Sequence, residues 1–124
     1  MREPPDNQLL ARAMRELADA PEYDAERFLR PVLEAFVQAT LIVGDDDGPI
    51  TVEGDDGGTY LALFTDLVEL SLFEPNLAWT TIQAEDAIRC VADGEVDGMM
   101  VNPAGSQLEL SKEDVLDFFD IDPA

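Results

Sequence analysis

Two runs rich in Asp and Gly, at residues 45–49 and 54–58, place sharp turns a few residues apart near the middle of the chain. The residues between them, Ile50 to Glu53, have the composition of a short strand between two turns. Val37 to Val43 precedes the first turn and is rich in β-branched residues, and Thr59 to Phe64 follows the second. The pattern predicts three consecutive strands joined by two hairpins.

Helical spacing of apolar residues precedes this β region. Gln8 to Ala18 has the pattern of an amphipathic helix, which Pro21 ends because the residue before a proline is disfavoured in the α region. A second apolar pattern, Phe28 to Phe36, follows Asp24, which suits an N-cap. Pro31 interrupts this pattern, so the helix either kinks there or begins a new first turn.

Helices and strands alternate in the second half of the chain. We expect helices after Asp66, Gln83 and Ser111, the first and third of them begun by side-chain caps. Strands are expected at Leu77 to Ile82, at 98–101 and at 108–110.

The element order predicts a single α+β domain over residues 1–124. Its core is expected to be a mixed, mainly antiparallel sheet of about five or six strands. The three later helices should cover one face, and the two N-terminal helices should pack at an edge or end.

The net charge limits the class of partner. The chain has 28 acidic and seven basic residues, for a formal charge of −21. Such a field repels nucleic acid and anionic membranes, and it favours a basic protein. An acid-biased proteome or selection for solubility would give the same acidic surface without any partner, so both origins of the charge stay open.

The residue inventory argues against an enzyme. Histidine is absent, which removes the commonest general base and metal ligand. Cys90 has no second cysteine or histidine that would activate it. A carboxylate mechanism would need one carboxyl group in an apolar pocket, whereas the acidic residues fall mainly in turns and on polar helix faces. We therefore expect no catalytic residues, cofactor or metal.

The densest acidic cluster lies in the two central turns, and it supplies the candidate partner-binding residues. Its spacing lacks the alternating oxygen ligands and later Glu of a calcium loop, so solvated turns are the favoured interpretation. The candidate residues are Asp45, Asp46, Asp47, Asp55 and Asp56.

A cytoplasmic location is expected. No segment reaches the ~20 apolar residues that span a bilayer, and the first residues lack the apolar region of a signal peptide. The single cysteine is also consistent with a reducing compartment.

Two motifs resemble the N-terminal domain of the SseB family, a bacterial family whose name ties it to type III secretion. One is Leu63-Phe64-Thr65-Asp66 with Leu70 in the following helix, and the other is Gly98-Met99-Met100-Val101-Asn102-Pro103. The resemblance runs from about Leu33 to Phe119. It implies the fold more strongly than the function, because the family has no agreed catalytic residues. Longer relatives carry a second, C-terminal domain.

The function expected is that of a non-enzymatic protein-interaction module, with acidic loops that steer a basic partner and an apolar patch that gives affinity. The resemblance suggests an accessory or chaperone-like secretion protein, and the charge suggests a toxin-neutralising protein. The alternative is a small-molecule or ion sensor with a pocket at the loop end of the sheet.

Overall fold

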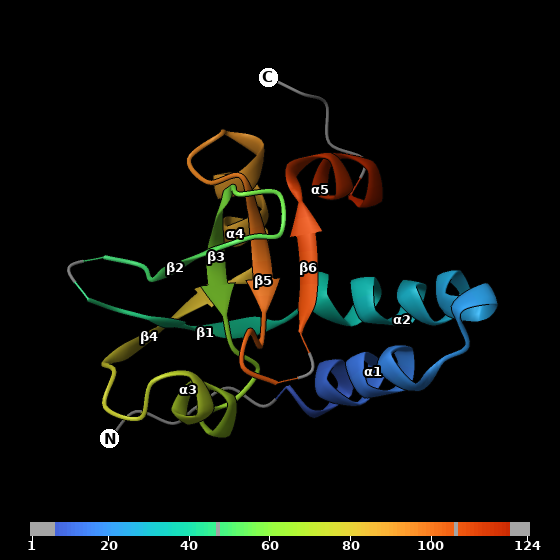
Figure 1. Ribbon diagram of the computed structural model, residues 1–124, viewed down its shortest axis with the longest axis horizontal. Coiled ribbons are helices and arrows are strands. Elements are labelled where there is room, and N and C mark those ends of the chain that lie inside the picture. Colours follow the sequence, from blue (N-terminus) through green and yellow to red (C-terminus); the bar gives the residue numbers. More distant parts are fainter. Residues whose placement is uncertain (1–6, 47, 106, 120–124) are drawn as a thin grey trace.

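The computed structural model describes residues 7–46, 48–105 and 107–119. This part of the chain contains five α-helices, one short 3₁₀ helix and six strands, which confirms the α+β class (Figure 1). The elements, in order, are α1 (Gln8–Asp19), η1 (Glu22–Asp24), α2 (Ala25–Val37), β1 (Thr40–Gly44), β2 (Thr51–Glu53), β3 (Thr59–Leu63), α3 (Leu67–Phe73), β4 (Trp79–Gln83), α4 (Ala84–Ala92), β5 (Gly98–Val101), β6 (Leu108–Ser111) and α5 (Lys112–Phe118).

The strands of the described residues form two sheets. The larger sheet has the order β2-β3-β5-β6, in which β3 and β5 are parallel and the other neighbours are antiparallel. The smaller sheet is the antiparallel pair β1-β4. A single bridge between Ile42 and Phe64 joins the two sheets. Figure 1 shows β1 and β4 running across the direction of β3, β5 and β6.

One of the two expected hairpins is complete. β2 pairs with β3 as predicted, whereas the described part of the turn between β1 and β2 contains an isolated bridge between Asp45 and Pro49. The meander was wrong here because β1 gives its strand hydrogen bonds to β4 instead. The boundary at Val37 was also wrong, since Val37 ends α2 and β1 begins at Thr40.

The N-terminal helices differ from expectation in two details. α2 continues through Pro31, which lies on its exposed side. The carbonyl that loses its helical partner there can therefore be hydrated. Asp24 occupies the N-cap position of α2, but its side chain makes no capping hydrogen bond. Residues 22–24 form the 3₁₀ turn before it.

The later helices begin at the predicted caps. The Asp66 carboxylate accepts a hydrogen bond from the Glu69 amide at 2.9 Å. Ser111 and Asp114 form a capping box at α5, each accepting from the other's backbone N–H. Gly94 follows α4 with φ +81°, a conformation that favours glycine.

Alternating strand residues divide the interior into two clusters. Leu41, Val43, Leu61 and Leu63 pack with α1, α2, α4 and α5 in the main core. Ile42, Ala62 and Phe64 point to the other side and pack with Leu70 of α3. The three later helices therefore do not share one face, because α3 covers the side opposite α4 and α5. None of the helices described is long and apolar enough to cross a bilayer.

Candidate functional site

The acidic residues of the two central turns are not gathered into one surface. Asp45 and Asp46 lie in the turn between β1 and β2, and Asp55 and Asp56 lie in the turn between β2 and β3. Figure 1 shows these turns at opposite ends of β2. All four residues are exposed, and Asp47 lies outside the described residues.

Two of these aspartates hold their own turns. Asp45 accepts a hydrogen bond from the Gly48 N–H at 3.1 Å. Asp56 accepts from the Gly58 N–H at 2.9 Å and from the Tyr60 hydroxyl at 3.0 Å. These bonds hold the pKa of Asp56 below its ordinary value. Asp46 and Asp55 have exposed side chains without such a role in the described structure, so they are the members most available to a partner.

Two acidic residues that the sequence did not single out join the second turn. Glu109 of β6 accepts a hydrogen bond from the Asp55 N–H at 3.0 Å. Asp97, just before β5, accepts from the Thr59 N–H at 2.8 Å. Neither is close to the turn in sequence, and only the β3-β5-β6 pairing brings them there. Within residues 7–46, 48–105 and 107–119, no group of three or more carboxylate or thiol side chains could hold a metal ion.

The pKa of Tyr60 provides a test of the hydrogen bond between Tyr60 and Asp56 in this turn. Burial, followed by the hydrogen bond to Asp56, raises the pKa of Tyr60 to about 12. A folded pKa above the unfolded value of 10.0 stabilises the protein fully below pH 10, and this contribution is lost as the pH rises toward 12. In a Tyr23→Phe variant, Tyr60 is the single tyrosine, and its ultraviolet titration should have a midpoint near 12.

The same variant unfolded in denaturant is the control and should titrate near the ordinary tyrosine pKa of about 10. A native midpoint equal to the unfolded one, with the fold intact by circular dichroism, would show that Tyr60 is neither buried nor bonded to Asp56.

The two motifs of the SseB resemblance meet in a buried pair of polar side chains. Thr65 and Asn102 are 1% and 5% exposed, at the ends of the parallel strands β3 and β5. The Thr65 N–H donates to Asn102 Oδ1, and Asn102 Nδ2 donates to Thr65 Oγ1, both at 3.0 Å. Asn7 Nδ2 adds a hydrogen bond to the Thr65 carbonyl oxygen. These bonds give both motif residues an architectural role.

Glu69 and Cys90 are the two candidate catalytic side chains whose pKa values are raised in the described structure. Burial, followed by the charge of Asp66, raises the pKa of Glu69. In the described structure, however, the Glu69 carboxylate has no hydrogen-bonding or nucleophilic partner, and it packs against the Gly105 backbone. Burial and the nearby Glu95 raise the pKa of the Cys90 thiol, which keeps it protonated and unreactive at neutral pH.

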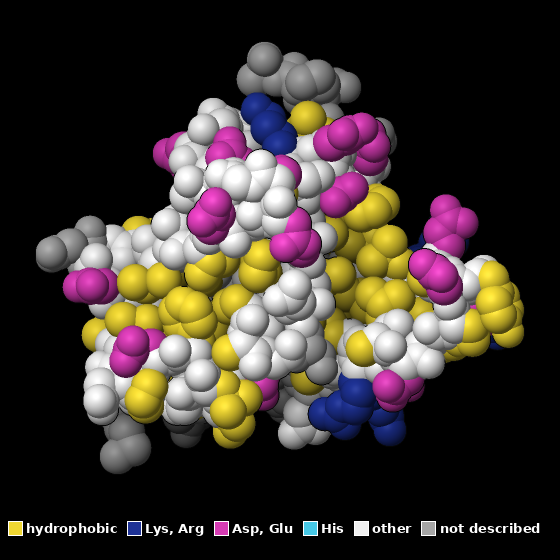
Figure 2. Space-filling view, viewed as in Figure 1, with side chains coloured by type: hydrophobic (Ala, Val, Ile, Leu, Met, Phe, Trp, Pro, Cys, Tyr) yellow, Lys and Arg dark blue, Asp and Glu magenta, His cyan; other side chains and the backbone are white. Residues whose placement is uncertain are grey.

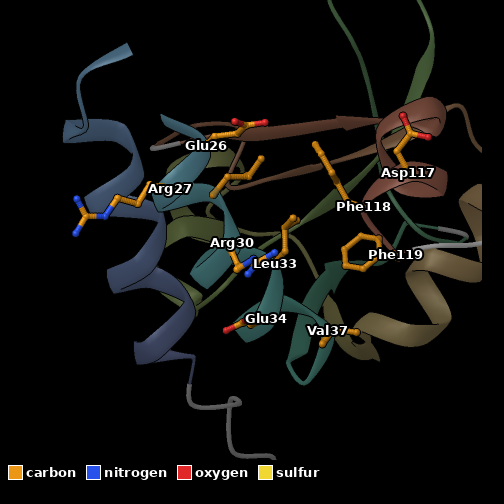
Figure 3. A pocket seen from close by; sticks show the side chains of 10 residues that line it. Glu26, Arg27, Arg30, Leu33, Glu34, Val37, Asp117, Phe118 and Phe119 are labelled. Atoms are coloured by element: carbon orange, nitrogen blue, oxygen red, sulfur yellow. The ribbon is translucent and has the colours of Figure 1, made fainter. Parts of the chain in front are cut away.

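A groove lies between α2 and α5. It encloses about 890 Å³. Its apolar lining comes from one stripe of α2 and from the end of α5: Leu29, Leu33, Val37, Phe118 and Phe119. In Figure 3, Leu33, Phe118 and Phe119 point into the space between the two helices. Val37 and Phe118 are 45% and 41% exposed, so part of this apolar surface is open to solvent.

Charged side chains border the groove. Glu26, Glu34 and Asp117 line it together with two arginines of α2. Arg27 lies 3.9 Å from Asp24, over the ring of Phe28, and Figure 3 shows it pointing away from the groove. In Figure 2, a hydrophobic surface continues below α5, bordered above by acidic side chains. The border is therefore predominantly acidic, with Arg30 as the basic group closest to the apolar stripe.

The sequence pattern did not reveal this groove. Val32 and Phe36 of α2 are fully buried, while Leu29, Leu33 and Val37 form a second stripe at helical spacing on a neighbouring side. Both stripes belong to one apolar pattern when the sequence is considered alone. The sequence did contain one indication of the groove. The apolar residues of α2 cover a wider part of the helix surface than a single buried face requires. A smaller groove of about 520 Å³ lies between α1 and α2.

Comparison with known proteins identifies the family. Neither the curated proteins nor the solved structures include a match to this chain. The family model of the SseB protein N-terminal domain matches residues 10–116, which include both motifs and every strand. The chain therefore belongs to the SseB protein N-terminal domain family.

Proposed function

We propose that this chain is a non-enzymatic protein-interaction module whose α2–α5 groove holds an apolar segment of a basic partner protein. The supporting observation is the partly exposed stripe of Leu29, Leu33 and Val37, which faces Phe118 across the groove. A helix that presents apolar residues outside the core offers the kind of surface that receives amphipathic segments. The groove would supply most of the affinity.

The distribution of charge supports a partner with basic flanks. The chain carries −21, yet four of its seven cationic residues, Arg12, Arg15, Arg27 and Arg30, lie on α1 and α2. Residues beyond α2 are therefore strongly acidic and border the groove from the α5 side. Basic residues on the partner would be attracted there, whereas phosphate backbones and anionic lipids would be repelled.

Within this proposal, an accessory or chaperone-like role fits the open groove, because a chaperone must present apolar surface to a client. Neutralisation of a basic toxin fits the acidic surface equally well. The single thiol is consistent with a cytoplasmic setting for either role. We favour these roles over a sensor, since the groove is open and lies between helices, away from the loop end of the sheet.

The groove is tested by placing a charge in it. Proteins captured by the wild type from the native host would be measured individually against Val37→Glu, with Leu72→Glu as the matched control on α3. We expect a basic partner whose dissociation constant rises about tenfold or more with Val37→Glu, because a charge in an apolar contact costs more than about 1.4 kcal/mol. Leu72→Glu should bind as the wild type does. Equal binding by all three proteins would contradict the assignment.

The acidic turns are expected to act on the rate of encounter. Asp46→Asn with Asp55→Asn removes two exposed charges and leaves the turn-holding Asp45 and Asp56 in place. Association with the partner should slow and depend less on salt, with dissociation nearly unchanged. Glu74→Gln with Asp93→Asn is the charge-matched control. If stopped-flow rates and their salt dependence match the wild type, the turns serve solubility alone.

A further inference from the structure

The walls of the groove between α2 and α5 are helical, so neither wall offers a strand edge to an occupant. The backbone N–H and C=O groups inside a helix are already bonded within that helix. An extended segment would leave its own backbone groups without partners where it faces the apolar lining, which costs free energy. A helical segment bonds its backbone internally. The groove therefore suits a helical occupant better than an extended one.

The apolar stripe of α2 indicates how long such a helix is. Leu29, Leu33 and Val37 recur every fourth residue, so they form a ridge along α2 that is about 12 Å long. Ridges with this spacing pack against the side chains of another helix. On the opposite wall, the ring of Phe119 is held 6.0 Å from that of the buried Phe36. A helix of about three turns covers the whole ridge.

The charged residues of the lining leave two carboxylates uncompensated. Arg27 points away from the groove in Figure 3, and it forms a 3.9 Å ion pair with a residue outside the lining. Arg30 and Glu34 lie one helical turn apart on α2, so their charges offset each other. Among the charged residues described in the lining, this leaves Glu26 and Asp117.

These two carboxylates lie at one end of the groove. Figure 3 shows Glu26 and Asp117 on opposite walls, at the end away from Val37. Glu26 belongs to the first turn of α2 and Asp117 to the last turn of α5, and both side chains are exposed. Neither belongs to an ion pair of the described residues. A cation between them would interact with two carboxylates, which is more favourable than one surface ion pair.

We infer that the segment held by the groove is an amphipathic helix of about three turns, with a Lys or Arg at the end that lies between Glu26 and Asp117. Its apolar residues pack on the α2 stripe. This inference rests on the groove function proposed above, and it adds the conformation of the partner segment and the position of its cation. Charge complementarity supports it, because a chain of −21 repels a segment with an acidic end. The two carboxylates then determine which segments bind, while the apolar stripe supplies most of the affinity.

The test measures binding of labelled synthetic peptides of about three helical turns to the full chain by fluorescence anisotropy. The lysine peptide has leucines at helical spacing and lysines at one end. A glutamine peptide replaces the lysines, and a proline peptide has a proline at its centre. Glu26→Gln with Asp117→Asn should weaken the lysine peptide about fivefold and the glutamine peptide less than about twofold. Glu74→Gln with Asp93→Asn removes the same charge outside the groove and should bind both peptides as the wild type does. The proline peptide should bind about tenfold more weakly than the lysine peptide, because proline disrupts a helix.

The variants separate failure of the groove from failure of this inference. If Val37→Glu binds the lysine peptide as tightly as the wild type does, the peptide lies elsewhere, which contradicts the groove function and this inference together. If Val37→Glu weakens binding but Glu26→Gln with Asp117→Asn acts no more strongly than its charge-matched control, the groove is retained and the position of the cation is wrong. Equal binding of the proline and lysine peptides would show that the occupant is not helical. Absence of binding by the lysine peptide would overturn this inference alone, because captured partners test the groove separately.

Discussion

Replacing Asn102 with alanine is expected to lower the free energy of unfolding by about 2–4 kcal/mol. The substitution leaves the buried Thr65 N–H and hydroxyl without their partner at the ends of β3 and β5. It also places alanine at φ 54°, where asparagine is tolerated better than most residues. The lost hydrogen bonds and the unfavourable backbone conformation both destabilise the variant. Equilibrium denaturation followed by circular dichroism measures their combined effect on the free energy of unfolding.

Two further variants separate these costs. Asn102→Gly accepts the backbone conformation, so it should recover about 1 kcal/mol relative to alanine while still lacking the amide. Asn76→Ala makes the same substitution at an exposed position and should change stability by less than about 0.5 kcal/mol. If Asn102→Ala unfolds at the same denaturant concentration as Asn76→Ala, the buried pair does not hold the strand ends together.

The second large effect is expected at Phe36, where alanine should cost about 3–5 kcal/mol. Phe36 is fully buried on α2, and its ring lies 6.0 Å from that of Phe119. Its removal leaves a cavity where α2 meets the main core. Phe118→Ala deletes the same side chain from a 41% exposed position and should cost less than about 1.5 kcal/mol. Equal losses for both variants would show that the α2–α5 contact, and not the core, determines stability there.

The sequence was sufficient to predict those elements whose ends are determined by residues close to them in the chain. α4 begins directly after Gln83 as predicted, and the caps Asp66 and Ser111 act within three residues of themselves. The side of the sheet that α3 covers could not be predicted the same way. It depends on Ile42 and Ala62 pointing away from the main core, which requires the register of β1 and β3.

The candidate site was predictable only in part, for the same reason. The sequence indicated that Asp45, Asp46, Asp55 and Asp56 lie in exposed turns, and the structure confirms this. It could not assign Asp56 to the Tyr60 hydroxyl, because that bond exists only when Tyr60 is buried. The groove required knowledge of where α5 lies against α2, a contact between segments far apart in the chain.

The parallel pairing of β3 with β5 has a consequence for the order in which the chain folds. Thr65 and Asn102 are separated by 37 residues, and the connection between them contains β4, which pairs outside this sheet with β1. The β2-β3 hairpin can form early because its loop is short, whereas β5 must wait for a long loop to close. During that interval the edge of β3 that will receive β5 is uncovered. A net charge of −21 would make unfinished chains repel one another during that interval.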